Sequence, residues 1–322
     1  MKKDKIELVY HGEPFTVPNN WDDLTQEQYV HLVRDLMLMS QGKLSPGEVR
    51  IRLLCDIMHW DVSKIRNEDA IANLVALSER LTFLFTISYP DNNAALDGLS
   101  REEKKLCRRV DPYQLPKTLS EKLGKLNYHY TVDLSFFKQQ LPSVVIDGKV
   151  YHGYRADKSF NQLTLSLTSL QYLEARELIN IEKALPLMAA ILYCPGEYDT
   201  ETAHLLGEEF KKLPKETLQA ISWNFQAVNN FLFTMTSFSL LTKFKEKKPS
   251  PIATDASDAL YDLSADGLGN NREVERMNVL TYLRILRKKT IDTVKQMRAM
   301  KMDTPTISIE TGLPLAIIND II

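Results

Sequence analysis

The sequence predicts an α+β protein that is mainly α-helical, with two β-hairpin-plus-helices units and a basic helix near the C-terminal end. Three observations support this class. Two alternating apolar segments flank short turns that contain glycine, as in β-hairpins. Most of the remaining chain repeats its apolar residues at helical spacing. Only 12 of the 322 residues are glycine, which leaves little room for extended β architectures. The length suggests about two domains.

The first unit opens with a hairpin and a capped helix. Ile6 to Tyr10 and Pro14 to Pro18 alternate around the turn His11-Gly12, which predicts two antiparallel strands. Thr25 and Gln28 then have the spacing of a capping box, which satisfies backbone donors at a helix start. Apolar residues at helical spacing extend this helix to about residue 40, and further helices are expected over 46–59 and 68–87.

The second unit repeats this order. Asp147-Gly148 lies between two short β-rich segments and predicts a type I′ turn. Thr168 and Gln171 again have capping-box spacing. Helices are expected over 184–193, from residue 200 to 213, and over 215–244. The last helix carries an aromatic stripe that indicates helical core, with a ligand groove as the alternative. The stripe comprises Trp223, Phe225, Phe231, Phe233 and Phe238.

Two short words occur in both units. Val-Tyr-His-Gly occupies 9–12 and 150–153, and Leu-Thr-x-x-Gln-Tyr occupies 24–29 and 167–172. Their similar offsets suggest an internal duplication. The alternative is that each word is turn or capping chemistry that suits its position locally.

The predicted domains are 1–140, 141–244, a linker over 245–271, and 272–322. The linker is rich in Ser, Ala, Asp, Gly and Asn, a composition typical of connecting segments. Residues 273–302 contain neither Pro nor Gly and predict one long helix. The last twenty residues form an apolar tail without an obvious core, and such a tail is expected to become ordered on a partner.

The formal charge of −2 hides an uneven distribution. Residues 272–301 hold nine basic and three acidic residues, a net charge of +6, which leaves −8 on the rest of the chain. The near-zero total argues against a generic nucleic-acid or membrane-surface binder.

The basic helix also carries a seam with 4-3-4-3 spacing, typical of helices that pack on other helices. The seam comprises Val279, Leu283, Leu286, Thr290, Thr293, Met297 and Met300. Three interpretations are open: packing on its own body, binding a partner helix or acidic surface, and binding nucleic acid. The expected partner-binding residues are Val279, Leu283, Leu286, Arg287, Lys288, Met297 and Met300.

The sequence offers little for catalysis. It has no His-x-x-x-His pair, no Cys-x-x-Cys pair, no nucleophile elbow and no Walker loop. His11 and His152 lie in matching words, but their turn positions explain them. An active site could be imagined from Tyr128, His129, Tyr130 and His152, but nothing in their spacing requires one. We therefore expect no enzyme, no catalytic residue, no metal and no cofactor.

The expected compartment is the cytoplasm. The sequence has neither the continuous apolar run of a signal peptide nor a membrane-spanning stretch. The three cysteines, at 55, 107 and 194, are expected to be reduced, with two of them in the core.

The order of these motifs resembles a group of tail-region proteins from phages of Bacteroidetes. The resemblance rests on Trp21, Leu24-Thr25, Gln28-Tyr29 and the segment Met188 to Pro195, and it spans roughly residues 15–240. Cys194 stands where the group usually has Arg. The resemblance implies a tail-assembly-chaperone-like protein without catalytic residues, whose partner is the tape-measure or another tail protein in the host cytoplasm. The alternatives are a structural virion component, such as a neck, connector or tail subunit, and an uncharacterised enzyme. Oligomerisation stays open.

Overall fold

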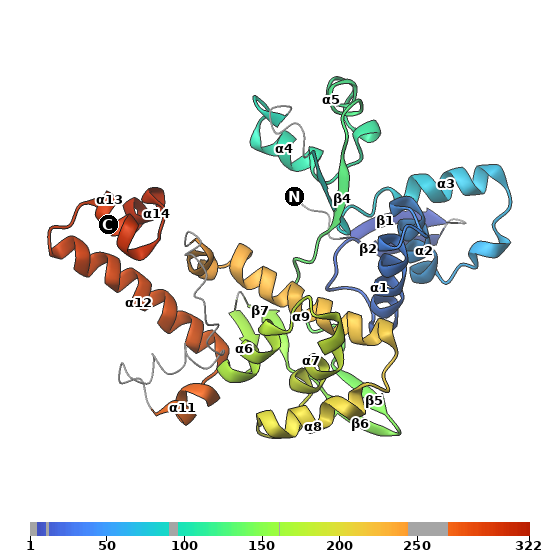
Figure 1. Cartoon of the computed structure of the whole chain (residues 1–322). Coiled ribbons are helices and arrows are strands. Elements are labelled where there is room, and N and C mark those ends of the chain that lie inside the picture. Colours follow the sequence, from blue (N-terminus) through green and yellow to red (C-terminus); the bar gives the residue numbers. More distant parts are fainter. Residues whose placement is uncertain (1–4, 11–12, 90–95, 161, 244–269) are drawn as a thin grey trace. The chain divides into compact units, whose positions relative to one another are not determined.

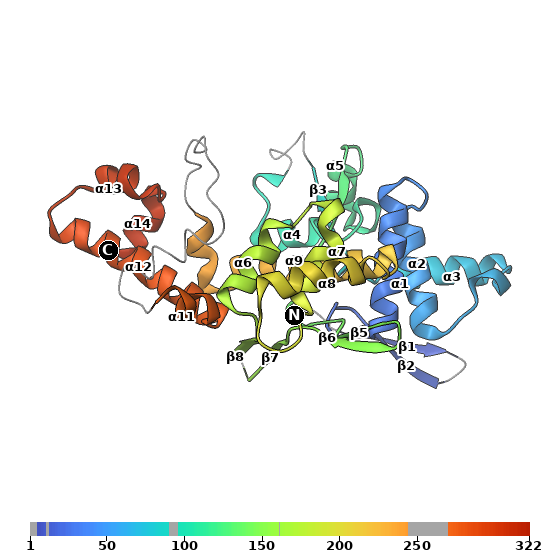
Figure 2. The same cartoon turned by 60° about the horizontal axis from the view of Figure 1, so that its bottom comes forward.

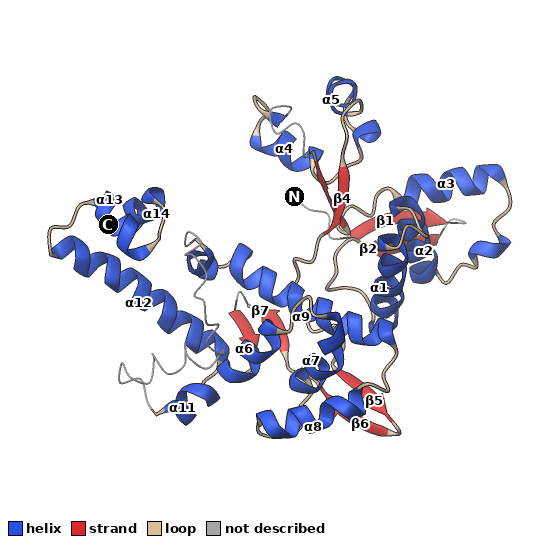
Figure 3. Ribbon diagram, viewed as in Figure 1, coloured by secondary structure: helices blue, strands red, loops and turns tan. Residues whose placement is uncertain are grey.

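The computed structural model describes residues 5–10, 13–89, 96–160, 162–243 and 270–322 (Figure 1). Contacts divide the chain into two compact units, Met1–Leu134 and Ser135–Ile322. The predicted α+β, mainly helical class is confirmed, because helices dominate and the sheets of the described residues are two-stranded antiparallel pairs (Figure 3). No described helix is both long and apolar enough to cross a membrane.

The first unit contains four strands and five α-helices in its described part. The strands are β1 (Lys5–Tyr10), β2 (Glu13–Pro18), β3 (Phe85–Ser88) and β4 (His129–Val132). The helices are α1 (Gln26–Ser40), α2 (Pro46–Met58), α3 (Glu68–Ser78), α4 (Arg101–Cys107) and α5 (Lys117–Leu123). β1 pairs with β2 as predicted, and β3 pairs with β4 across a long connection. The predicted turn at 11–12 lies outside the described residues.

The start of α1 follows from local chemistry. The Thr25 side chain accepts from the Gln28 backbone N–H, and the Gln28 side chain accepts from the Thr25 N–H, which completes the capping box. Leu24 and Tyr29 occupy the two positions of a hydrophobic staple, and both are buried. Trp21 stacks edge-on against Tyr29, with ring centroids 6.2 Å apart. These contacts fix the direction in which the chain enters the helix.

The helix expected over 68–87 is wrong beyond residue 78. α3 ends at Ser78, and the chain turns into strand β3. Leu81, Leu84 and Phe85 are fully or almost fully buried. The apolar residues after the turn therefore continue the hydrophobic pattern while the backbone changes from helix to strand, which apolar spacing alone does not separate.

The first unit also buries an ion pair. Arg50 on α2 lies 2.5 Å from the Asp111 carboxylate, and both side chains are almost fully buried. Tyr130 on β4 donates to the other Asp111 oxygen, and the Arg50 guanidinium lies 5.3 Å from the ring centroid of Phe85. The pair therefore ties α2 to the β3–β4 sheet and to the turn before residue 112.

The second unit contains two hairpins followed by helices. The strands are β5 (Ser143–Ile146), β6 (Lys149–His152), β7 (Ala156–Ser159) and β8 (Gln162–Leu165). The first helices are α6 (Ser169–Glu177), α7 (Leu185–Leu192), α8 (Thr200–Phe210) and α9 (Lys215–Met235). The C-terminal helices are α11 (Asn271–Arg276), α12 (Val279–Ala299), α13 (Thr304–Thr311) and α14 (Leu315–Ile321). Figure 2 shows both hairpins along one side of helices α6 to α9.

The β5–β6 turn has the predicted type I′ character, because Asp147 and Gly148 have φ values of 50° and 80°. The two copies of the repeated word Val-Tyr-His-Gly do not occupy equivalent positions. The word falls on the second strand of this hairpin at 150–152, with Gly153 just after the strand, but on the first strand of the N-terminal hairpin at 9–10. The two copies therefore occupy different strands, and the second unit places an additional hairpin before its capped helix.

The core of the second unit forms where α6, α7 and α9 meet. Tyr172, Phe225 and Val228 are fully buried, and the rings of Tyr172 and Phe225 lie 5.7 Å apart. The helix expected over 215–244 ends earlier, at Met235. The Thr236 side chain accepts from the Phe238 backbone N–H and starts a short 3-10 helix, η5 (Ser237–Thr242).

The helix expected over 273–302 is two helices, because Met277 and Asn278 interrupt it. Asn278 forms an antiparallel bridge with Thr168. The Ser169 N–H donates to the Met277 carbonyl at 2.8 Å, and the Val279 N–H donates to the Leu167 carbonyl at 3.0 Å. The C-terminal helices are thereby attached to the start of α6 by main-chain hydrogen bonds.

The expectation that the apolar tail lacks a core is also wrong. α13 and α14 fold back on the end of α12 and build a small hydrophobic cluster. Its buried members are Val294, Ile307, Leu313 and Ile318. Gly312, with φ of 73°, ends α13 and makes the reversal. The finer domain boundaries expected within 135–322 stay a prediction.

Candidate functional site

The seam of α12 faces one groove of the second unit. Five consecutive seam positions line this groove: Leu283, Leu286, Thr290, Thr293 and Met297. Its volume is about 750 Å³. Residues three and four apart lie on the same side of a helix, which explains why these five of the seven seam positions border the same groove. We call this groove, with the residues named in this subsection, the α12 groove.

Four other elements complete the α12 groove. α9 contributes Asn229, Asn230, Phe233 and Thr234. The 3-10 helix η5 contributes Leu241 and Thr242, α13 contributes Glu310 and Thr311, and α6 contributes Arg176. Tyr282 and Lys289 add to the α12 wall.

The floor of the groove is apolar, and its rim is polar. Tyr282 and Leu283 are 2% exposed, and Leu286, Phe233 and Met297 are half-buried. Burial raises the pKa of the Tyr282 hydroxyl, so its proton is retained at neutral pH. An apolar floor with a polar rim is the usual character of a site that takes up apolar side chains of a partner.

Positive charge is concentrated on α12, where Arg284, Arg287 and Lys295 line other pockets than this groove. α12 carries six basic residues and one acidic residue. Within the described part of the chain, five of these cations have no carboxylate within ion-pair distance. They are Arg284, Arg287, Lys288, Lys295 and Arg298. On the groove itself, Arg176 lies with its guanidinium 5.8 Å from the centroid of the Phe233 ring.

The structure separates the expected partner-binding residues into two groups. Leu283, Leu286 and Met297 line the α12 groove together. The other four do not. Val279 is fully buried at the root of α12, and Met300 is 74% exposed beyond the groove. Arg287 donates from Nε to the Ser237 carbonyl at 3.1 Å.

Lys288 is exposed and does not line the groove, whereas its neighbour Lys289 does. Sequence reasoning named Lys288 and missed Lys289, because both residues lie off the seam and the seam spacing does not distinguish them. It also missed Arg176, Tyr282, Leu241 and Glu310, whose sequence spacing relates them to no seam position. Phe233 had a signal, since it belongs to the aromatic stripe for which a groove was the alternative.

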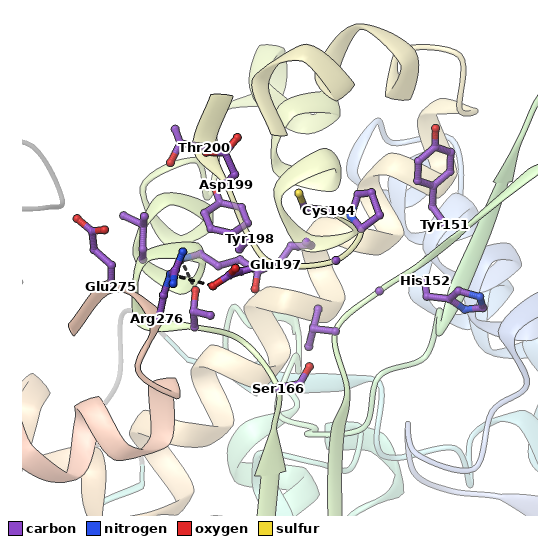
Figure 4. Close-up of a pocket in the computed structure, with 18 of the residues that line it drawn as sticks. Tyr151, His152, Ser166, Cys194, Glu197, Tyr198, Asp199, Thr200, Glu275 and Arg276 are labelled. Carbon is purple, nitrogen blue, oxygen red and sulfur yellow. Dashed lines mark hydrogen bonds and ion pairs between the residues drawn. The ribbon is translucent and has the colours of Figure 1, made fainter. Parts of the chain in front are cut away.

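A second pocket, of about 1020 Å³, lies between β6, the loop after α7, and α11 (Figure 4). Three of its charged groups serve the fold. Arg276 on α11 pairs with Glu197 at 2.8 Å. Asp199 accepts from the Thr202 hydroxyl and backbone N–H and so caps α8. These hydrogen bonds lower the pKa of Asp199.

The titratable groups beside them keep their protons. Burial raises the pKa of the Cys194 thiol, so the reactive thiolate is disfavoured. Burial and a hydrogen bond to Glu174 raise the pKa of Tyr198. Figure 4 shows the His152 ring directed away from Cys194, so the pocket does not bring this thiol and imidazole together.

The other residues considered for catalysis are distributed over the chain. Tyr128, His129 and Tyr130 belong to the first unit, whereas His152 belongs to the second. His11 lies outside the described residues. Among those that the structure describes, no group of three or more His, Cys, Asp or Glu side chains could hold a metal ion. Cys55 and Cys107 are buried, as expected, and Cys194 is half-buried; all three are free cysteines.

The sequence matches no protein-family model, and neither a curated protein nor a solved structure matches it.

Proposed function

We propose that this chain is a non-enzymatic, tail-assembly-chaperone-like phage protein that binds a helical partner, such as the tape-measure protein, in the host cytoplasm. The observation that carries the proposal is the placement of five consecutive seam positions on one groove that the described residues leave open. A seam used only for internal packing would be covered along its length. The motifs around Trp21, Tyr29 and Tyr193 supply the phage-tail context.

The chemistry of the groove suits this function. A helical partner presents apolar side chains at positions i, i+3 or i+4, and i+7, and these enter apolar grooves. A long helical protein exposes such stripes until it finds its assembly partners, and exposed apolar stripes promote aggregation. Covering one stripe in the α12 groove would keep the partner soluble without any catalysed reaction.

The proposal is tested by co-expression with a tape-measure fragment. The wild-type chain is expected to move the fragment from the pellet to the soluble fraction. Leu286→Asp places a carboxylate on the groove floor and should abolish this effect. Ile309→Asp is the matched control, because Ile309 is 79% exposed and does not line the groove. Unchanged aggregation of the fragment with the wild-type chain would reject the proposal.

Mass spectrometry of purified particles separates the chaperone from a structural virion component. A chaperone is absent from mature virions, whereas a neck, connector or tail subunit is present at stoichiometric amounts. For the remaining alternative, an enzyme, the substitutions of His11 and His152 by Ala are expected to leave function intact.

A further inference from the structure

We propose that a side of α12 away from the α12 groove binds the phosphate backbone of double-stranded nucleic acid without regard to base sequence. Four cations form this side, and we call them the basic stripe: Arg284, Arg287, Lys288 and Lys295. The inference goes beyond the proposed function, because it gives α12 a second partner on a second side.

The basic stripe occupies one side of the helix. At about 100° per residue, its four members fall within an arc of about 100°, centred about 140° from the seam positions that line the α12 groove. Between residues 284 and 295 this arc holds one other residue, Ile291. Asp292, the one acidic residue of α12, lies outside the arc. The stripe is therefore a nearly continuous positive surface that is separate from the groove.

The cations of the stripe are not neutralised by the fold. Arg284, Lys288 and Lys295 are exposed, and no described carboxylate lies within ion-pair distance of them. The near-zero charge of the whole chain does not cancel this surface, because salt screens exposed charges beyond about 10 Å. An anion at the stripe therefore meets the local positive charge.

Arg287 is oriented by the fold. Its Nε donates to the Ser237 carbonyl at 3.1 Å, and its side chain borders two hollows of about 520 and 390 Å³. Ser237 lines both hollows, Gln162 lines the first and Ser239 lines the second. Serine hydroxyls and glutamine amides commonly contact phosphate oxygens beside Arg and Lys. The stripe is thus bordered by side chains that suit a phosphate backbone.

The composition of the stripe favours a phosphate backbone over a protein. The core of a protein interface is apolar and depleted of charged residues, but Ile291, the one apolar residue of the arc, is half-buried. Binding to phosphates needs charge alone, because the release of counterions supplies the free energy. Single-strand sites stack bases on aromatic side chains, and the arc contains none. The stripe therefore suits a double strand.

The length of the stripe gives the expected footprint. Residues 284–295 span about 17 Å of helix, which corresponds to about five base pairs of duplex. Four neutralised phosphates predict a slope of about −3.6 for the logarithm of the binding constant against the logarithm of the salt concentration. Phosphate contacts do not read bases, so duplexes of different sequence should bind equally.

The test is the fluorescence anisotropy of a fluorescein-labelled DNA duplex of about 20 base pairs, added to the full-length protein. We expect binding at about 50 mM salt that weakens about a hundredfold by about 200 mM. Lys288→Gln and Lys295→Gln should each weaken binding about tenfold at the lower concentration and make the salt slope shallower by about one.

A gain of affinity provides a test that unfolding cannot imitate. Asp320 on α14 is exposed, and it is the one carboxylate side chain among the described residues that lines either hollow. It shares its hollow with Lys295. Asp320→Asn removes this negative charge and should tighten DNA binding about twofold. Weaker binding of this variant would contradict the inference.

Lys183→Gln is the matched control, because Lys183 is an exposed lysine of the same unit outside α12. Its effect should stay within about twofold, with an unchanged salt slope. Equal losses for Lys183→Gln and Lys288→Gln would overturn the inference. Absence of binding at about 50 mM salt, or tighter binding of polyglutamate of equal charge, would do the same.

The DNA assay and the co-expression assay report on different sides of α12. Lys288→Gln should therefore solubilise the tape-measure fragment as well as the wild-type chain does. Because DNA binding needs no tape-measure fragment, the proposed function and the nucleic-acid inference can fail separately.

Discussion

Arg50 and Asp111 show how single residues join distant parts of the first unit. Their side chains are 61 positions apart in sequence and meet at 2.5 Å, with Tyr130 donating to the same carboxylate. Removing one member of a buried ion pair leaves the other charge uncompensated. The pair is invisible to sequence reasoning, because nothing in the local pattern relates residue 50 to residue 111.

Asp111→Ala is therefore expected to lower the free energy of unfolding by about 3–5 kcal/mol. Urea denaturation followed by circular dichroism measures this loss. Glu208→Ala is the control, because it breaks the exposed Glu208–Lys211 pair and should cost no more than about 1 kcal/mol. Equal effects of the two substitutions would contradict the role assigned to the buried pair.

Residue 153 must be glycine because the ring of a buried tyrosine lies close to its backbone. A Cβ atom at this position would lie 2.9 Å from the ring of Tyr193, and Tyr193 is almost fully buried. Gly153→Ala is expected to destabilise the protein by about 1–3 kcal/mol through overpacking. Gly47→Ala, in α2, is the matched substitution, since a Cβ atom there would lie 3.9 Å from its nearest neighbour, the Ser45 hydroxyl oxygen. It should leave the stability unchanged or raise it by about 0.4–1 kcal/mol. The melting temperatures of both variants, measured by thermal denaturation, test this difference.

The repeated word Leu-Thr-x-x-Gln-Tyr has a local explanation at the scale of elements. In both copies Thr is the N-cap, and the Leu and Tyr occupy the positions of a hydrophobic staple. Leu24, Tyr29, Leu167 and Tyr172 are all buried. The second box is incomplete, because Gln171 donates to the Ile191 carbonyl at 2.7 Å. Helix-start chemistry therefore accounts for the word without requiring a duplication.

Local signals predicted the starts of helices better than their ends. The caps at Thr25 and Thr168 and the turn at Asp147-Gly148 depend on neighbouring residues, and all three are confirmed. The break at Met277–Asn278 depends on hydrogen bonds to residues 165–169. The same limit applies to the α12 groove. Its seam could be predicted because the seam lies on one helix. The walls from α6, α9, η5 and α13 could not, because these elements are distant from α12 in sequence.

The root of α12 should be weakened by Asn278→Ala. The Asn278 side chain caps α12 through the Leu280 N–H and also donates to the Leu165 carbonyl at 2.6 Å. Its loss is expected to cost about 1–2 kcal/mol and to speed amide exchange over 274–283. Thr281→Ala, at an exposed position of the same turn, is the control. Unchanged exchange at the root would contradict the attachment described above.

At the scale of the whole molecule, buried tyrosines set the alkaline limit of stability. Burial raises the pKa of Tyr89 to about 12, and it raises those of Tyr172 and Tyr193 as well. An unfolded tyrosine titrates near pH 10. The folded state thus holds these protons more tightly, so their contribution is complete below about pH 10 and is lost as the pH rises toward the folded pKa.

The urea midpoint is therefore expected to stay constant between about pH 8 and 9.5 and to fall steeply above about pH 10. Ultraviolet absorbance of tyrosinate should rise together with the loss of folded signal. Complete tyrosine ionisation in a protein that is still folded would contradict the burial of these hydroxyls.

The positive C-terminal region and the groove beside it define the central claim, which is recognition of a partner helix. Hydrogen–deuterium exchange of the full-length protein, with and without the tape-measure fragment, tests this claim most directly. The account predicts new protection over 229–242 and 283–297, with little change in α1 and α2. Protection confined to the first unit, or to the pocket around Tyr198, would contradict it.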